Sequence, residues 1–253
     1  MSLNIYGTTF LNDNELSFCL DTGLGIEIIQ YMTWEGMNKF NEVKHLIDEY
    51  AKKSKKTSMH GICYDMVYSA SDPMLRDIIK LRFALTFEIA LFHGINQVVF
   101  HSTGNLREHR SETAAKYWIE RCVEFWDDFY KYIPENMQIL IENVDDTNPA
   151  ALSAMIKAIG KPNIRCCFDV GHAYISSALP LDEWVDALGD VIAHIHLHDN
   201  NGKEDNHLTL GKGKIPLFKT LNRLIGVVPP DTPFVLECEK KPSMDWLRKH
   251  GFI

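Results

Sequence analysis

The sequence predicts an α/β fold, a (β/α)8 TIM barrel formed as a single domain by residues 1–253. Strand-like runs rich in Ile, Val and Phe recur at near-regular intervals, and each is followed by a segment with helical periodicity. Eight such units fit this length without a linker or a break in composition, as a closed barrel requires. A doubly wound sheet is disfavoured, because the first turn, Thr8–Asn12, lacks the glycines of a dinucleotide site.

The expected strands are short, and helix signals separate them. In chain order they are Asn4–Thr8, Gly25–Gln30, Thr57–Cys63, Gln97–Ser102, Gln138–Val144, Arg165–Val170, Ala193–His198 and Phe234–Glu239. Two helices begin where Asp72 and Asn148 each precede a proline, since such residues cap a helix and proline suits its first position. Helix stops are expected at Gly94, Gly160, Gly189 and Gly226. The longest helices are expected over Met74–Phe92 and Thr113–Tyr132, which are both amphipathic.

Composition and charge limit the class of protein. The formal net charge of −8 disfavours nonspecific attraction to nucleic acid or to an anionic membrane. No stretch reaches the roughly 20 apolar residues of a membrane span, and residues 1–10 lack a basic region followed by an apolar one. The six cysteines form no Cys-x-x-Cys pair, which predicts reduced core thiols. We therefore expect a cytoplasmic globular protein without a membrane partner, and its oligomeric state is left open.

Six of the expected strands end in side chains that commonly bind metal ions. They are His60, His101, Glu142, Asp169, His196 and Glu237. Each follows an apolar run, and the C-terminal ends of barrel strands converge on one small area. Three carboxylates would repel one another there without a counter-charge, which a divalent metal supplies. Imidazole and carboxylate together suit zinc, manganese or iron, and we expect Zn or Mn as the cofactor.

An ordered set of motifs along most of the chain resembles one family. The motifs are Met59-His60-Gly61, Val99-Phe100-His101-Ser102, Ile141-Glu142-Asn143, Phe168-Asp169-Val170-Gly171-His172-Ala173, His196-Leu197-His198-Asp199, Asp205-Asn206-His207, Leu210-Gly211-Lys212-Gly213 and Leu236-Glu237. They make the chain similar to the xylose isomerase-like TIM barrels. That superfamily includes the sugar phosphate isomerases and epimerases and the endonuclease IV family (AP endonuclease family 2).

The resemblance implies a metal site with one to three ions. The ketose epimerases hold one metal with residues that match Glu142, Asp169, His196 and Glu237, and the two glutamates also serve as acid and base. Endonuclease IV builds a three-metal site from nine ligands. Positions similar to all nine occur here, at His60, His101, Glu142, Asp169, His172, His196, Asp205, His207 and Glu237.

Some histidines have an open role or stand outside this ligand set. His172 is open to two roles, as a ligand or as a donor of a hydrogen bond to the substrate. His198 and Asp199 closely follow His196 and are left out of the ligand set. By strand alternation His198 points the same way as His196, and either could support the ligands from behind. His194 stands in no motif and is expected to be a surface or packing residue, as are His45, His93 and His109.

Three functions follow as hypotheses. The first is a sugar or sugar-phosphate isomerase or epimerase, in which Glu142 and Glu237 move protons on opposite faces of the substrate. Against it, Asn200, Asn201 and Gly202 occupy the stretch where the epimerases place an arginine. The second is an endonuclease IV-like phosphodiesterase, which the nine matching ligands favour. The third, a catalytically idle binding barrel, is disfavoured because the ligands are intact.

Basic residues on the active-face loops are candidates for binding an anionic group of a small substrate. These are Arg107, Arg110, Lys203, Lys212 and Lys214, and the expected substrate-binding residues among them are Arg107, Lys203 and Lys212. They suffice for one anion but are too few for a duplex, which gains its affinity by having several phosphates neutralised. A small sugar or sugar phosphate is therefore the expected partner, and DNA is the alternative.

Overall fold

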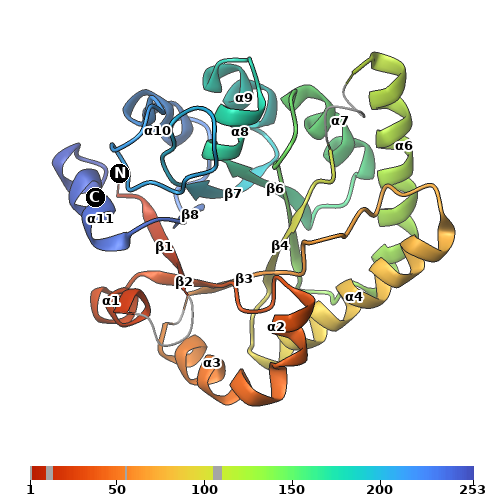
Figure 1. Ribbon diagram of the computed structural model, residues 1–253, viewed down its shortest axis with the longest axis horizontal. Helices are drawn as coiled ribbons and strands as arrows, with labels where there is room; N and C mark the ends of the chain where they lie inside the picture. The colour runs from red at the N-terminus through yellow and green to blue at the C-terminus, as the bar shows by residue number, and fades with distance from the viewer. Residues whose placement is uncertain (1, 10–13, 55, 105–109) are drawn as a thin grey trace.

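The protein forms a closed barrel of parallel strands in a computed structural model that describes residues 2–9, 14–54, 56–104 and 110–253 (Figure 1). The strands are β1 (Asn4–Thr9), β2 (Gly25–Ile28), β3 (Thr57–His60), β4 (Gln97–His101), β5 (Gln138–Glu142), β6 (Ile164–Asp169), β7 (Ile192–Leu197) and β8 (Pro233–Leu236). They pair in chain order, and β8 closes the barrel against β1. The predicted (β/α)8 fold is confirmed, whereas the extent of the domain over residues 1–253 stays a prediction.

Helices surround the barrel on its outer side, as Figure 1 shows. They are α1 (Asn14–Thr22), α2 (Trp34–Asn38), α3 (Phe40–Ser54), α4 (Pro73–Phe92), α6 (Glu112–Phe129), the short 3-10 helix η1 (Tyr130–Tyr132), α7 (Pro149–Ile159), α8 (Val170–Ser176), α9 (Leu181–Leu188), α10 (Leu217–Ile225) and α11 (Lys240–Lys249). Within the described ranges, none of them is long and apolar enough to cross a membrane. The cytoplasmic location stays a prediction.

The helix boundaries follow the capping residues expected from the sequence. The side chain of Asp72 accepts a hydrogen bond from the backbone N–H of Met74 at the start of α4. Asn148 does the same for Ala150 at the start of α7, and α7 ends at Gly160 with a φ of 64°. Glycine tolerates this left-handed conformation without strain, so the sequence signal and the observed stop have the same cause.

Strand alternation places the polar strand ends inside the barrel. Val99 and Leu140, on β4 and β5, pack together in a small cluster that is separate from the main core between barrel and helices. Side chains two residues apart on a strand face the same way. His101 and Glu142 therefore also point into the barrel, one layer closer to the C-terminal ends of the strands than Val99 and Leu140. On the side of β4 and β5, an apolar layer therefore lies beneath the polar groups.

Candidate metal centre at the strand ends

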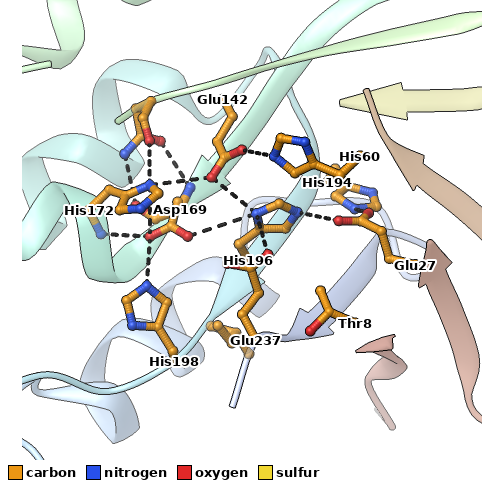
Figure 2. Close-up of polar contacts among 12 residues, drawn as sticks. Thr8, Glu27, His60, Glu142, Asp169, His172, His194, His196, His198 and Glu237 are labelled. Atoms are coloured by element: carbon orange, nitrogen blue, oxygen red, sulfur yellow. Dashed lines mark hydrogen bonds and ion pairs between the residues drawn. The ribbon is translucent and has the colours of Figure 1, made fainter. Parts of the chain in front are cut away.

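The six predicted strand-end residues come together at one end of the barrel. His60, His101, Glu142 and Asp169 are the last residues of β3, β4, β5 and β6. His196 is the last residue but one of β7, and Glu237 directly follows β8. Figure 2 shows five of these side chains pointing toward one another from different strands. The barrel thus assembles residues that lie up to 177 positions apart in the chain, between His60 and Glu237.

Four of them form the tightest group, at the centre of the site. Glu142, Asp169, His196 and Glu237 each offer a ligand atom, and these atoms all lie within 4.8 Å of one another. His196 Nδ1 is 3.1 Å from Glu142 Oε1 and 3.4 Å from Glu237 Oε1. Asp169 Oδ2 lies 3.8 Å from the same nitrogen. These are the four residues that the ketose epimerase resemblance implied; that they bind a metal stays a prediction.

Two histidines approach the central group from the next strands. His60 Nε2 is 3.2 Å and His101 Nε2 is 3.7 Å from Glu142 Oε2. Glu142 therefore has one oxygen toward His196 and the other toward this pair. The Sγ of Cys63 lies within 4.8 Å of a ring nitrogen of both histidines. Burial raises the pKa of the Cys63 thiol to about 12, so it is a protonated group.

A third group lies on the other side of the centre. His172 Nε2 is 3.3 Å and His207 Nε2 is 3.0 Å from Asp205 Oδ2. His198, which the sequence analysis left out of the ligand set, belongs to this group, because its Nε2 is 3.4 Å from both Asp205 and Asp169. His198 is fully buried, whereas the Asp205 side chain is 37% exposed. Alternation from His196 along β7 was the signal for its inward position.

Histidines around the central group hold the buried carboxylate of Glu142 ionised. Burial alone would raise the pKa of Glu142, but His196, His172 and His60 outweigh it and hold the pKa well below its usual range. Conversely, burial would lower the pKa of His196, but the carboxylates around it, including Glu237 and Glu142, raise it well above the ordinary value. The buried carboxylates are therefore stable only with positive charge beside them, and protons on the imidazole rings supply that charge when no cation is bound.

The donor set fits a divalent metal ion. Asp169 Oδ2 is buried and has no hydrogen bond within the described part of the chain, so a charged oxygen is left unsatisfied in a region without water access. Three carboxylates and one imidazole, with no thiolate, are the ligands of a borderline or hard cation such as zinc or manganese. A cation among Glu142, Asp169, His196 and Glu237 would satisfy that oxygen and replace the imidazole protons.

A cavity of about 520 Å³ opens onto the three groups. Its described lining residues are Thr8, Ile29, Met32, His60, Tyr64, His101, Glu142, Val144, His172, Asp205, His207 and Glu237. Lys203 and Lys212 are exposed on the loop after β7 and are not among these residues. Arg107 lies outside the described residues. The described wall of the cavity therefore offers imidazole, carboxylate and apolar groups, and neither lysine expected to bind substrate forms part of it.

The loop that carries Asp205 and His207 is organised by Asp199. Its Oδ1 accepts hydrogen bonds from the N–H groups of Asn200 and Ile215, and its Oδ2 accepts them from Gly211 and Gly213, all at 2.8–3.1 Å. A Cβ on Gly213 would lie 2.2 Å from Asp199 Oδ1, which explains glycine there. Asp199 thus fixes residues 200–215 and with them the third group.

Replacing Asp199 with asparagine should destabilise the fold by roughly 3 kcal/mol, the value of one or two hydrogen bonds to a charged group. In asparagine, an NH2 group replaces one carboxylate oxygen of Asp199. That NH2 group would face two backbone N–H donors and could accept a hydrogen bond from neither. The melting temperature should fall by roughly 6–12 °C for a chain of this size. Glu204→Ala, in the same loop but exposed, is the control and should change it by less than about 2 °C. Equal melting temperatures for Asp199→Asn and the control would contradict this role.

The pH dependence of stability should reverse when metal is bound. His207 has its pKa raised to about 9: burial opposes the rise, but Asp205 and Glu237 outweigh it. In protein without metal, the charged His207 stabilises the folded state fully below the pKa of about 6.5 that it has in the unfolded chain. This stabilisation is lost as the pH rises through 9. Asp205, whose pKa is lowered by His172 and His207 despite burial, stabilises above about pH 4 and loses this effect as pH falls further.

The melting temperature of metal-free protein should therefore be highest between about pH 4 and 6.5 and fall toward pH 9. Metal binding requires deprotonated imidazole, so the metal-loaded protein should gain from rising pH. Thermal scans with zinc or with a chelator, at pH 6 and pH 9, measure the difference. If the difference in melting temperature between metal-loaded and metal-free protein became smaller toward pH 9, this electrostatic account would be contradicted.

Comparison with known proteins identifies the family of the chain. The family described as xylose isomerase-like TIM barrel matches residues 23–250. The chain belongs to this family. The resemblance drawn from the sequence motifs is thereby confirmed for the family and the fold.

Among curated relatives, an uncharacterised protein from Methanocaldococcus jannaschii is 30% identical over 156 residues, which is 59% of this chain and 50% of that protein. Fructoselysine 3-epimerase from Escherichia coli O157:H7 is 31% identical over 67 residues, 26% of this chain and 24% of the enzyme. The match thus spans half the length of the first relative and about a quarter of the second.

Solved structures have the same fold over nearly the whole chain. A D-tagatose 3-epimerase-like protein superposes with a TM-score of 0.76 at 19% identity, covering 98% of this chain and 97% of that one. A Thermus thermophilus protein soaked with ZnCl2 gives a TM-score of 0.73 at 21% identity, over 99% and 98% of the two chains. At such identities the likeness shows the fold.

Proposed function

We propose that the chain is a metal-dependent sugar isomerase or epimerase. The observation that supports this most is the pair of carboxylates Glu142 and Glu237, which reach the same nitrogen of His196 from the ends of β5 and β8. Both line the cavity, so a substrate there contacts two groups able to accept and return a proton. The named activities of D-tagatose 3-epimerase-like and fructoselysine 3-epimerase relatives point to the same class of chemistry.

In this proposal Glu142, Asp169, His196 and Glu237 hold a zinc or manganese ion. The ion supplies Lewis acidity, which makes the C–H bond beside a bound carbonyl group more acidic. One glutamate removes the proton from that carbon, and the other delivers a proton to the opposite face, so the configuration inverts with no net change in atoms. Apolar Ile29, Met32 and Val144 on the cavity wall limit the access of water to the reacting carbon.

Phosphodiester hydrolysis of the endonuclease IV type is the second candidate. It is favoured by the two outer groups, His60 with His101 and His172 with Asp205 and His207, which complete the nine positions of a three-metal site. No Lys or Arg is found among the described residues that line the cavity, and this disfavours a phosphate backbone as ligand. We therefore place the sugar first and DNA second.

The deciding assay gives metal-loaded protein a panel of ketoses and sugar phosphates in D2O beside a duplex with an abasic site. The proposal expects incorporation of deuterium at one carbon of a sugar, together with isomerisation or epimerisation. Cleavage of the duplex that needs metal and is lost in Glu142→Gln, without exchange in any sugar, would overturn it in favour of the hydrolase. Neither activity in metal-loaded protein would also count against it.

A further inference from the structure

Beneath the metal centre lies a polar group that the proposed reaction does not use. Glu27, in the middle of β2, is fully buried, and so are its contacts His194 and His196 on β7. The sequence predicts His194 as a surface or packing residue, and Glu27 is not among the predicted site residues. Figure 2 shows Glu27 on the side of His196 that faces away from Glu142.

The contacts of Glu27 divide between its two oxygens. Oε2 accepts a hydrogen bond from Ser58 Oγ at 2.7 Å and lies 2.8 Å from His194 Nε2. Oε1 lies 3.0 Å from His196 Nε2. In the described part of the chain, neither Oε1 nor His196 Nε2 has a well-aligned hydrogen bond to any group. The interaction between Glu27 Oε1 and His196 Nε2 is therefore the main one that offsets the cost of burying these two polar atoms.

The two ring nitrogens of His196 consequently face different surroundings. Nδ1 points at Glu142, Asp169 and Glu237, where a metal ligand needs a free lone pair. Nε2 lies 3.0 Å from Oε1 of the Glu27 carboxylate, which can only accept a proton donated to it. A hydrogen bond from one imidazole nitrogen fixes both the ring orientation and the nitrogen that remains free for a metal.

We propose that Glu27 and His194 form a positioning pair that orients His196 toward the metal centre. Glu27 accepts the Nε2 proton of His196, and His194 together with Ser58 holds the Glu27 side chain in place. The inference rests on the proposed function in one respect, because it takes His196 as a metal ligand. Glu27 touches neither the cavity nor the four central ligand atoms, so it acts only through His196.

The affinity for zinc tests this pair. Glu27→Gln keeps the size of the side chain but replaces one acceptor oxygen with an N–H donor, and it should weaken zinc binding about 10- to 100-fold. His194→Gln should also weaken zinc binding, but by less. It replaces Glu27→Gln as the test variant if the Glu27→Gln protein does not fold. Glu49→Gln is the matched control, because it makes the same substitution in an exposed ion pair with Lys53 on α3, away from the site. It should change the affinity less than threefold.

A second readout uses wild-type protein and does not depend on a variant that folds. In wild-type protein labelled with ¹⁵N-histidine, the Nε2–H of His196 should give a slowly exchanging signal with and without zinc. An unprotonated or freely exchanging Nε2 in wild type, or Glu27→Gln and His194→Gln proteins that bind zinc within threefold of wild type, would overturn the proposal. Failure of the proposed function looks different, because wild type would then show the protected Nε2–H but bind no zinc or turn over no sugar.

Discussion

Glu142→Gln should empty the central metal site and abolish turnover. Glu142 is the residue shared by all the groups, since its two oxygens lie within 3.7 Å of His60, His101, His172 and His196. Removing one partner from a buried charged network costs about 3–5 kcal/mol, because the remaining charges lose their compensation. This corresponds to a rise in the Kd for the metal of roughly 10²- to 10³-fold or more. Equilibrium dialysis followed by elemental analysis measures it.

The control for this variant is Glu49→Gln, a substitution of the same kind in an exposed ion pair with Lys53 on α3. It should leave metal content and activity at the wild-type level, since exposed pairs contribute little. Circular dichroism of the Glu142→Gln protein establishes that the barrel still forms. A Glu142→Gln protein that keeps a full equivalent of metal with wild-type affinity would show that Glu142 is not at the centre of the site.

Glu237→Gln should stop proton transfer while leaving more of the metal in place. Glu237 directly follows β8, its side chain is partly exposed to the cavity, and its Oε1 reaches His196 Nδ1 at 3.4 Å. An amide cannot take up the proton that a carboxylate accepts, so exchange of the substrate C–H with D2O should slow by roughly 10²- to 10⁴-fold. Deuterium incorporation followed by NMR measures the rate.

Asp205→Asn is the informative partner of Glu237→Gln. Asp205 belongs to the third group and lies outside the four central residues. If proton transfer uses only the central four, Asp205→Asn should keep exchange within about tenfold of wild type. Exchange in the Glu237→Gln protein at the wild-type rate would exclude Glu237 as a proton-transfer residue. Exchange lost equally in Asp205→Asn would mean that the outer groups take part in the reaction.

The fold was predictable because its local signals agree. Apolar runs of strand length, proline after a capping residue at Asp72 and Asn148, and glycine at helix ends all indicate the same alternation, and the barrel follows from it. The strand ends were less predictable. Residues 57–63 read as one strand, but β3 ends at His60, since Cys63 bonds to Met32 beyond β2 and the chain leaves the barrel wall.

The candidate site divides in the same way. The C-terminal ends of the strands converge in any such barrel, so the meeting of the six strand-end residues from His60 to Glu237 at one end of the barrel could be predicted from the sequence. Glu27 could not, because a single acid within an apolar strand shows neither its depth nor its partner, 167 residues away at His194. Its signal was the charge itself, in Gly25-Ile26-Glu27-Ile28, since a buried charge in a strand needs a partner. The role of Asp199 likewise depends on backbone N–H groups, which sequence does not display.

The metal content of the protein tests the central claim most directly. Protein purified without chelator and reloaded with Zn, Mn, Fe or Co should hold at least one equivalent per chain by elemental analysis. Anomalous diffraction from its crystals should place an ion between Glu142, Asp169, His196 and Glu237, and further ions beside His60 or His207 would extend the site as the nine-ligand resemblance implies. Well under one equivalent after reloading, or an ion bound only away from these four side chains, would contradict the account.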